Sequence, residues 1–186
     1  MGDIDPICRR AAAALAVIAS LSAPLLFAQS ASVSLGGGLN VPLGTFDDIV
    51  KIGWQASAAV TFASRNSPLG IQVDGSFSKL ADETPLDIKS QQVYGTANVV
   101  YRFHTAEGAP YRPYLIGGGG IYNSKTTGSD APAGSSTKFG INVGAGFDFS
   151  LGGAGLFVET RFHDIFTEGP NVKFLPITLG IRFGAS

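Results

Sequence analysis

The 186-residue sequence predicts an all-β fold: an eight-stranded antiparallel up-and-down transmembrane β-barrel preceded by a cleaved signal peptide. Three observations lead to this fold class. From residue 31 onward, apolar and polar residues alternate with a period of two, which is typical of half-buried strands. Hydrophobic residues make up 45% of the chain but charged residues only 15%, whereas soluble domains carry about 25%. No later apolar run approaches the roughly 18 residues of a transmembrane helix, so strands must cross the membrane.

The beginning of the chain has the three parts of a secretory signal peptide. A pair of arginines precedes an apolar stretch over 11–28, and the small residues Ala28 and Ser30 permit cleavage after either. A retained membrane anchor is the alternative, which the alanine-rich composition and an internal proline disfavour. We therefore assign 1–30 to the signal peptide and 31–186 to one outer-membrane barrel domain.

The first four predicted strands are the segments 31–41, 54–63, 70–78 and 91–103. In each segment apolar residues occupy every second position, and mostly small or polar residues occupy the positions between them. In the third, for example, Ile71 and Val73 alternate with Gln72 and Asp74. Most of the eight segments have about the 9–11 residues that a tilted strand needs to cross a bilayer.

The last four predicted strands are the segments 111–122, 138–149, 155–165 and 172–183. The sixth strand has the clearest alternation, with Ile141 and Val143 on one face and Asn142 and Gly144 on the other. The fifth contains four consecutive glycines, so the pattern leaves open which of its faces points outward.

The connections between these segments alternate in character. Three are mostly short turns, over 64–69, 104–110 and 150–154. Four are mostly longer and polar, over 43–52, 79–90, 123–137 and 164–171. Outer-membrane barrels combine short periplasmic turns with longer extracellular loops. We therefore expect both ends of the barrel domain on the periplasmic side.

The apolar face of the barrel is expected to point outward, into lipid. The opposite face consists mainly of Gly, Ser, Thr, Asn and Gln, which suits a narrow packed lumen. The apolar face carries no charged residue in the seven strands where it can be assigned, as hydrocarbon requires. Aromatic residues gather near strand ends, as at the two membrane interfaces. The predicted lipid-interface aromatics are Trp54, Phe62, Phe77, Tyr101, Phe103, Tyr114, Phe139, Phe149, Phe162 and Phe183, with Tyr111, Tyr122 and Phe174 also placed at the rims.

Several segments together carry a resemblance to a known family. They are residues 38–44 (GLNVPLG), 113–122 (PYLIGGGGIY), 144–149 (GAGFDF), 157–163 (FVETRFH) and 175–183 (LPITLGIRF). In order and spacing they resemble the outer-membrane β-barrel domain family of OmpA-like and opacity-protein-like barrels. The resemblance implies the outer membrane of a Gram-negative-type bacterium, outer-membrane lipid as surroundings, and recognition of the last strand by the barrel-assembly machinery. Phe183 matches the family's terminal aromatic, although three residues follow it here.

The charged residues of the polar face are predicted to form a lumen network. Inward-facing carboxylates and cations nearly balance, and glycines on the neighbouring strands leave room for long side chains. The predicted network consists of Asp74, Arg102, Lys138, Asp148, Glu159, Arg161, His163 and Arg182. The formal net charge of −1 provides no basic field for nucleic acid. The single cysteine, Cys8, lies before the barrel, so no disulfide or thiolate metal site is expected there.

The sequence favours a non-enzymatic barrel with a filled lumen and an envelope-structural or surface-interaction role through its four loops, with no cofactor. A soluble periplasmic barrel that binds a small apolar ligand is the first alternative, and it would need the apolar face inside. A lipid-modifying enzyme built around His163 and a metal site of His163, Asp164 and Glu168 are weaker alternatives. A diffusion pore is disfavoured because eight strands enclose little more than side chains.

Overall fold

The computed structural model describes residues 30–43, 51–64, 67–81, 89–106, 108–127, 134–151 and 154–184. Apart from Ser30, the predicted signal peptide lies outside these residues. Among the described residues, none forms a helix long and apolar enough to cross a membrane. The strands are β1 (Ser30–Leu43), β2 (Lys51–Ala63), β3 (Leu69–Ala81), β4 (Lys89–Arg102), β5 (Tyr111–Thr127), β6 (Gly134–Leu151), β7 (Ala154–Ile165) and β8 (Val172–Gly184).

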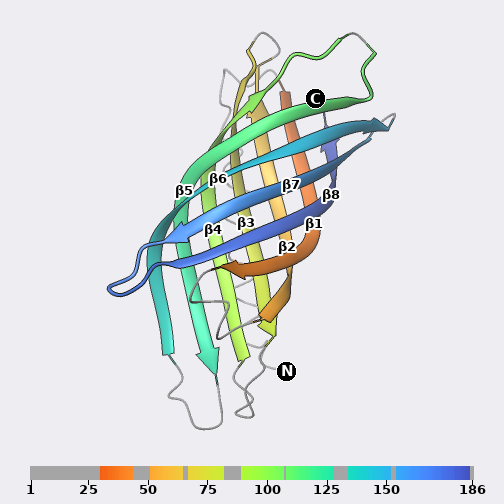
Figure 1. The fold of residues 1–186 in the computed structure, drawn as a ribbon. Coiled ribbons are helices and arrows are strands. Elements are labelled where there is room, and N and C mark those ends of the chain that lie inside the picture. The colour runs from red at the N-terminus through yellow and green to blue at the C-terminus, as the bar shows by residue number, and fades with distance from the viewer. Residues whose placement is uncertain are drawn as a thin grey trace, which may run out of the picture.

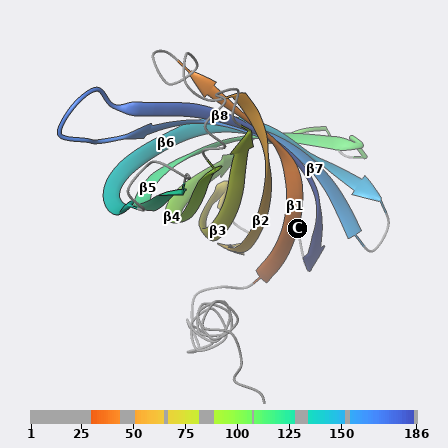
Figure 2. The ribbon, with the colours of Figure 1, turned by 90° about the horizontal axis from the view of Figure 1, so that it is seen from below.

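The eight strands form one closed antiparallel barrel in sequence order, so the predicted fold class is confirmed (Figures 1 and 2). Each strand pairs with the next in the chain, and β1 closes the barrel by pairing with β8 from Ser32↔Gly184 to Leu43↔Lys173. Closure leaves no unpaired strand edge, which is the condition for placing strands in hydrocarbon.

The two ends of the barrel differ, and we name them by their connections. The turn end joins β2 to β3, β4 to β5 and β6 to β7; the loop end joins β1 to β2, β3 to β4, β5 to β6 and β7 to β8. In Figure 1 the turn end is at the top and the loop end is at the bottom. The first residues of β1 and the last residues of β8 both lie at the turn end.

The strands are longer than predicted at the loop end of β5 and β6. Their pairing continues to Thr126↔Gly134, so most of the loop predicted over 123–137 is a hairpin. Within this extension the Asn123 amide donates to the hydroxyls of Ser135 (3.0 Å) and Thr137 (2.9 Å). The prediction missed the extension because its side chains are polar on both faces, and a strand outside the bilayer needs no apolar face.

Side chains sort by strand face as the alternation predicts. Val143 on β6 is 62% exposed, whereas the neighbouring Asn142 is 5% exposed. Exposed and buried positions alternate in the same way along β1, β3, β4, β7 and β8, and most of the buried side chains are polar. A soluble barrel with an apolar interior would show the opposite arrangement, so this alternative is wrong.

The facing of β5, which the sequence left open, is clear in the structure. Tyr114, Ile116 and Tyr122 are 1–2% exposed inside the barrel, whereas Leu115 and Ile121 are 49% and 62% exposed outside. The prediction that Tyr114 and Tyr122 belong to the lipid interface is therefore wrong.

Phe174 is also misplaced by the prediction, because it shares the inward face of β8 with Pro176 and Thr178 and is 1% exposed. An aromatic ring near a strand end indicates contact with the membrane interface only when it occupies one of the alternating strand positions whose side chains point outward.

Candidate functional site: the barrel interior

Strand β7 lines the interior from the turn end to the loop end. Its buried inward residues, in this order, are Phe157, Glu159, Arg161, His163 and Ile165. Each lies opposite small or polar residues of β6, because the register pairs Glu159 with Gly146 and Arg161 with Gly144. A side chain at either glycine would overlap the lumen contents or neighbouring backbone: a Cβ on Gly144 would lie 2.8 Å from Cγ of Arg161. These glycines therefore make room for the long side chains, as predicted.

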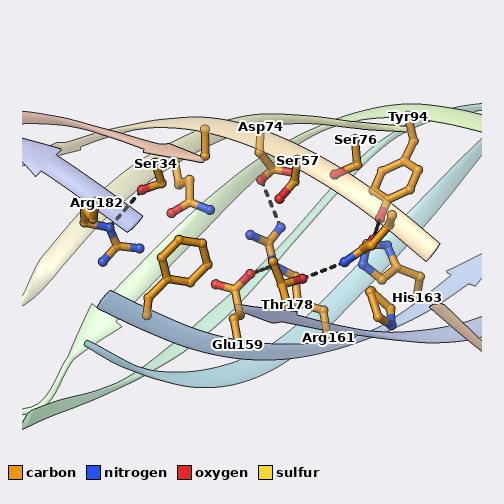
Figure 3. A pocket seen from close by; sticks show the side chains of 15 residues that line it. Ser34, Ser57, Asp74, Ser76, Tyr94, Glu159, Arg161, His163, Thr178 and Arg182 are labelled. Carbon is orange, nitrogen blue, oxygen red and sulfur yellow. Dashed lines mark hydrogen bonds and ion pairs between the residues drawn. The ribbon is translucent and has the colours of Figure 1, made fainter. Parts of the chain in front are cut away.

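An ion triad occupies the middle of the lumen (Figure 3). The Arg161 guanidinium contacts Glu159 through Nε (2.6 Å) and Asp74 through Nη1 (2.9 Å). The three side chains are at most 9% exposed. Asp74 also accepts hydrogen bonds from Thr96 (2.9 Å) and Asn98 (2.7 Å). Buried charges of this kind are tolerated only when paired and hydrogen-bonded.

A second ionic group lies nearer the turn end. Asp148 pairs with Arg182 and, at 3.6 Å, with Arg102. The Arg182 guanidinium also donates from Nε to the Ser34 hydroxyl (3.0 Å) and lies over the Phe157 ring at 5.3 Å from its centroid. We call this group and the triad together the charged layer: Asp74, Arg102, Asp148, Glu159, Arg161 and Arg182.

Tyr114 connects the two parts of the charged layer. Its hydroxyl donates to Glu159 Oε2 (2.9 Å), and its ring lies 5.6 Å from the Arg182 guanidinium. The ring lies against Gly146, where a Cβ would come within 2.5 Å of it. Gly146 thus leaves room for the inward-pointing ring of Tyr114, and this relation between β5 and β6 becomes visible only once the register is known.

An aromatic cluster fills the lumen towards the loop end. Tyr94, Tyr122, His163 and Phe174 pack around one another, with centroid distances from 4.6 Å for His163 on Phe174 to 6.2 Å for Tyr122 on Phe174. The Tyr122 hydroxyl is 2.8 Å from Nδ1 of His163, and the Tyr94 hydroxyl donates to Gln55 (3.1 Å). We call this cluster the aromatic layer. His163 belongs to it and has no ion-pair partner among the described residues.

Lys138 was predicted to join the lumen network but lies at its loop-end mouth. Its ammonium group pairs with Glu168 at 3.0 Å, and the Glu168 side chain is 94% exposed. The hydrogen bond from Lys138, together with its charge, lowers the pKa of the Glu168 carboxyl. The structure thus brings six of the predicted network residues together in the charged layer, whereas Lys138 and His163 have other partners.

Little free space remains inside. The cavity bounded by the triad, Tyr94, Phe157 and Arg182 has about 30 Å³ for the centres of water-sized spheres (Figure 3). One water needs roughly 10–15 Å³ on this measure. This cavity therefore has room for two or three waters.

The interior has no arrangement suited to nucleophilic catalysis or metal binding in the described part of the chain. Nδ1 of His163 is bonded to a tyrosine rather than to a serine, and Nε2 is buried without a partner. No group of three His, Cys, Asp or Glu side chains is placed to hold a metal ion among the described residues.

The outer wall presents most of the predicted aromatics. Two rings near the turn end, Tyr101 and Phe103, are each 40% exposed and pack edge to face at 5.1 Å. Near the loop end, Trp54 (51% exposed) packs on Phe77 at 5.7 Å. The other predicted aromatics with outward positions are Phe139, Phe149 and Phe183, which are exposed, and Phe62 and Phe162, which are partly exposed.

A closed eight-stranded barrel with an apolar exterior and a filled polar interior defines an integral outer-membrane protein of the small-barrel class. The sequence matches the model of the outer membrane protein beta-barrel domain over residues 12–183. The chain belongs to this family, as the resemblance predicted, and the family is one of the outer membrane.

Solved structures of other outer-membrane proteins share the fold. Neisserial surface protein A (NspA) is similar over 83% of this chain and 96% of its own, with 16% identity and a TM-score of 0.65. Ail, the attachment invasion locus protein of Yersinia pestis, is similar over 84% and 98%, with 17% identity and a TM-score of 0.57. The outer membrane enzyme PagL is similar over 82% and 98%, with 18% identity and a TM-score of 0.50. No curated protein matches the sequence.

Proposed function

We propose that this protein is a non-enzymatic, non-conducting barrel that holds its loop end at the cell surface for an envelope-structural or surface-interaction role. The filled interior is the observation that supports this role most directly. The charged and aromatic layers occupy successive levels of the lumen, and the cavity that residues of both layers line has a volume of only about 30 Å³. Because the outer wall faces lipid and the lumen is filled, specific binding of another molecule would take place at the two ends of the barrel.

The loop end supports an outward-facing role. The β5–β6 pairing continues to Thr126↔Gly134 at this end, and the polar side chains of 123–125 and 135–137 are exposed or partly exposed. Two barrels of similar fold bear names of a surface protein and an attachment protein. Since the likeness is one of fold, the interaction itself is our inference for this chain, and the partner is left open.

The proposal includes export and assembly. A signal peptide over 1–30 would take the chain through the inner membrane, and the assembly machinery would recognise the last strand at Phe183. The strand β1 begins at Ser30, which favours cleavage after Ala28, because cleavage after Ser30 would shorten this strand. The intact mass of protein extracted from outer membranes distinguishes these two cleavage sites from a retained leader.

Planar-bilayer recordings test the closed lumen. We expect no sustained conductance from the purified protein, because Arg161 and Arg182 cross the lumen to carboxylates on other strands. Stable, reproducible channel steps from the unmodified protein would contradict the proposal.

A lipid-modifying enzyme is the second candidate, because PagL is an enzyme with a similar fold. His163 points into the lumen, away from lipid, and stacks on Phe174 at 4.6 Å. We therefore expect no release of fatty acid from lipid A by the purified protein. A measurable activity that His163→Ala abolishes, in a variant that still folds, would replace the proposal with this candidate.

A further inference from the structure

A second cavity opens at the turn end of the barrel. Its volume is about 90 Å³, three times that of the lumen cavity described above. Arg112, Asp148 and Arg182 supply its charged lining, while the methyl groups of Ala109 and Ala154 supply part of its apolar lining. The cavity therefore combines cationic groups with a small apolar compartment.

The described charges around this cavity do not balance. Asp148 is shared by Arg102 and Arg182, so one carboxylate serves two guanidinium groups. Arg112 is the register partner of Asp148 across β5 and β6, yet it has no ion-pair partner among the described residues. Arg102 and Arg182 thus share one carboxylate and Arg112 adds a third guanidinium group, so the described residues carry two more positive than negative charges here.

Arg182 has hydrogen-bond capacity left over. It is 6% exposed, and its bonds within the described chain go from Nε to Ser34 and from Nη1 to Asp148. A guanidinium group has five N–H donors, so several have no protein acceptor in the described part of the chain. Donors that are largely removed from water gain most from a charged acceptor.

We propose that the turn-end cavity binds the carboxylate of a small organic acid or of a peptide terminus, with Arg112 and Arg182 as its donors. A planar carboxylate matches the fork of a guanidinium group and can bind it through two parallel hydrogen bonds. The space beside Ala109 and Ala154 accommodates a short apolar group attached to the carboxylate. The site is separate from the loop end and does not depend on a surface role. In the topology inferred above, it faces the periplasm.

The test uses the whole folded protein in nanodiscs, titrated with N-acetylalanine and followed by NMR of the backbone amides. We expect saturable shifts that concentrate at the β4–β5 connection and at the start of β7. N-acetylalaninamide, which lacks the negative charge, should produce none. Arg112→Gln should weaken binding at least tenfold, whereas Lys173→Gln at the loop end should leave it unchanged.

Three results would overturn this site. One is the absence of saturable shifts, or equal shifts with the neutral amide. Another is inorganic phosphate binding as tightly as the carboxylate, which would indicate a general anion site. The third concerns Glu107, which lies outside the described residues but close in sequence to Ala109: binding that appears only in Glu107→Gln would mean that the protein's own carboxylate fills the cavity. Unchanged heat-dependent gel mobility verifies that each variant folds.

Discussion

The charged layer and the aromatic layer both fill the lumen, the first with ion pairs and the second with packed rings. In the charged layer, Arg161 contacts two carboxylates within 2.9 Å, and the stability of each ion depends on its partners. In the aromatic layer, four rings fill the space, and a single hydrogen bond joins Tyr122 to His163. Arg161 and His163 lie only two positions apart on β7, so they are neighbours on its inward face. The contrast predicts that single substitutions should be costly in the charged layer and milder in the aromatic layer.

The largest effect is expected from Arg161→Met. Methionine retains much of the volume but leaves Asp74 and Glu159 as buried carboxylates without a cation. Removing one partner of a buried ion pair typically costs about 3–5 kcal/mol. Urea unfolding of the protein in lipid vesicles measures the loss.

The control for this variant removes all three charges. Asp74→Asn, Glu159→Gln and Arg161→Met combined leave no unpaired ion, so we expect most of the lost stability to return. If the triple variant were less stable than Arg161→Met alone, the carboxylates would not be the source of the cost, and the contrast between the layers would have another cause.

A buried tyrosine that contacts the charged layer can be compared with one in the aromatic layer through the contribution of each hydroxyl to stability. Tyr114 and Tyr122 are both 1% exposed, and their hydroxyls form hydrogen bonds with Glu159 and His163, respectively. The Tyr114 hydroxyl donates to the Glu159 carboxylate, and a hydrogen bond to a charged group contributes about 1.5–3 kcal/mol. The Tyr122 hydroxyl bonds an imidazole, for which about 0.5–1.5 kcal/mol is expected if the ring is neutral.

We therefore expect Tyr114→Phe to lower the free energy of unfolding more than Tyr122→Phe does. Both variants keep the ring, so packing changes little and the comparison isolates the hydroxyl. Unfolding curves recorded in the same lipid give the difference. Equal losses, or a larger loss for Tyr122→Phe, would show that the charged layer is no more demanding than the aromatic layer.

The sequence predicted the charged layer better than the aromatic layer, for a physical reason. Asp74, Glu159 and Arg182 lie on strands where apolar and polar residues alternate clearly, so this alternation alone predicts that their side chains point inward. Tyr114 and Tyr122 lie on β5, where glycines at 117–120 interrupt the pattern that would reveal facing. An aromatic ring fits either a membrane interface or a lumen, and its strand position decides which; Gly146, opposite Tyr114 in the register, only leaves room for the inward ring.

The smallest effect is expected at the loop-end mouth, where the Lys138–Glu168 pair is exposed to water and provides a comparison for the buried ions. The hydrogen bond and charge of Lys138 lower the pKa of Glu168. A lowered carboxyl pKa stabilises the fold above the unfolded-state pKa, near 4.3, and this contribution disappears as the pH falls through the lower folded-state value. For an exposed pair we expect almost no change in unfolding free energy from Lys138→Ala.

The pKa of the Glu168 carboxyl should return to its ordinary value in that variant, as carboxyl-carbon NMR titration would show. An unchanged Glu168 pKa would mean that the pair does not form in solution, whereas a stability loss comparable to that of Arg161→Met would remove the distinction between exposed and buried ions.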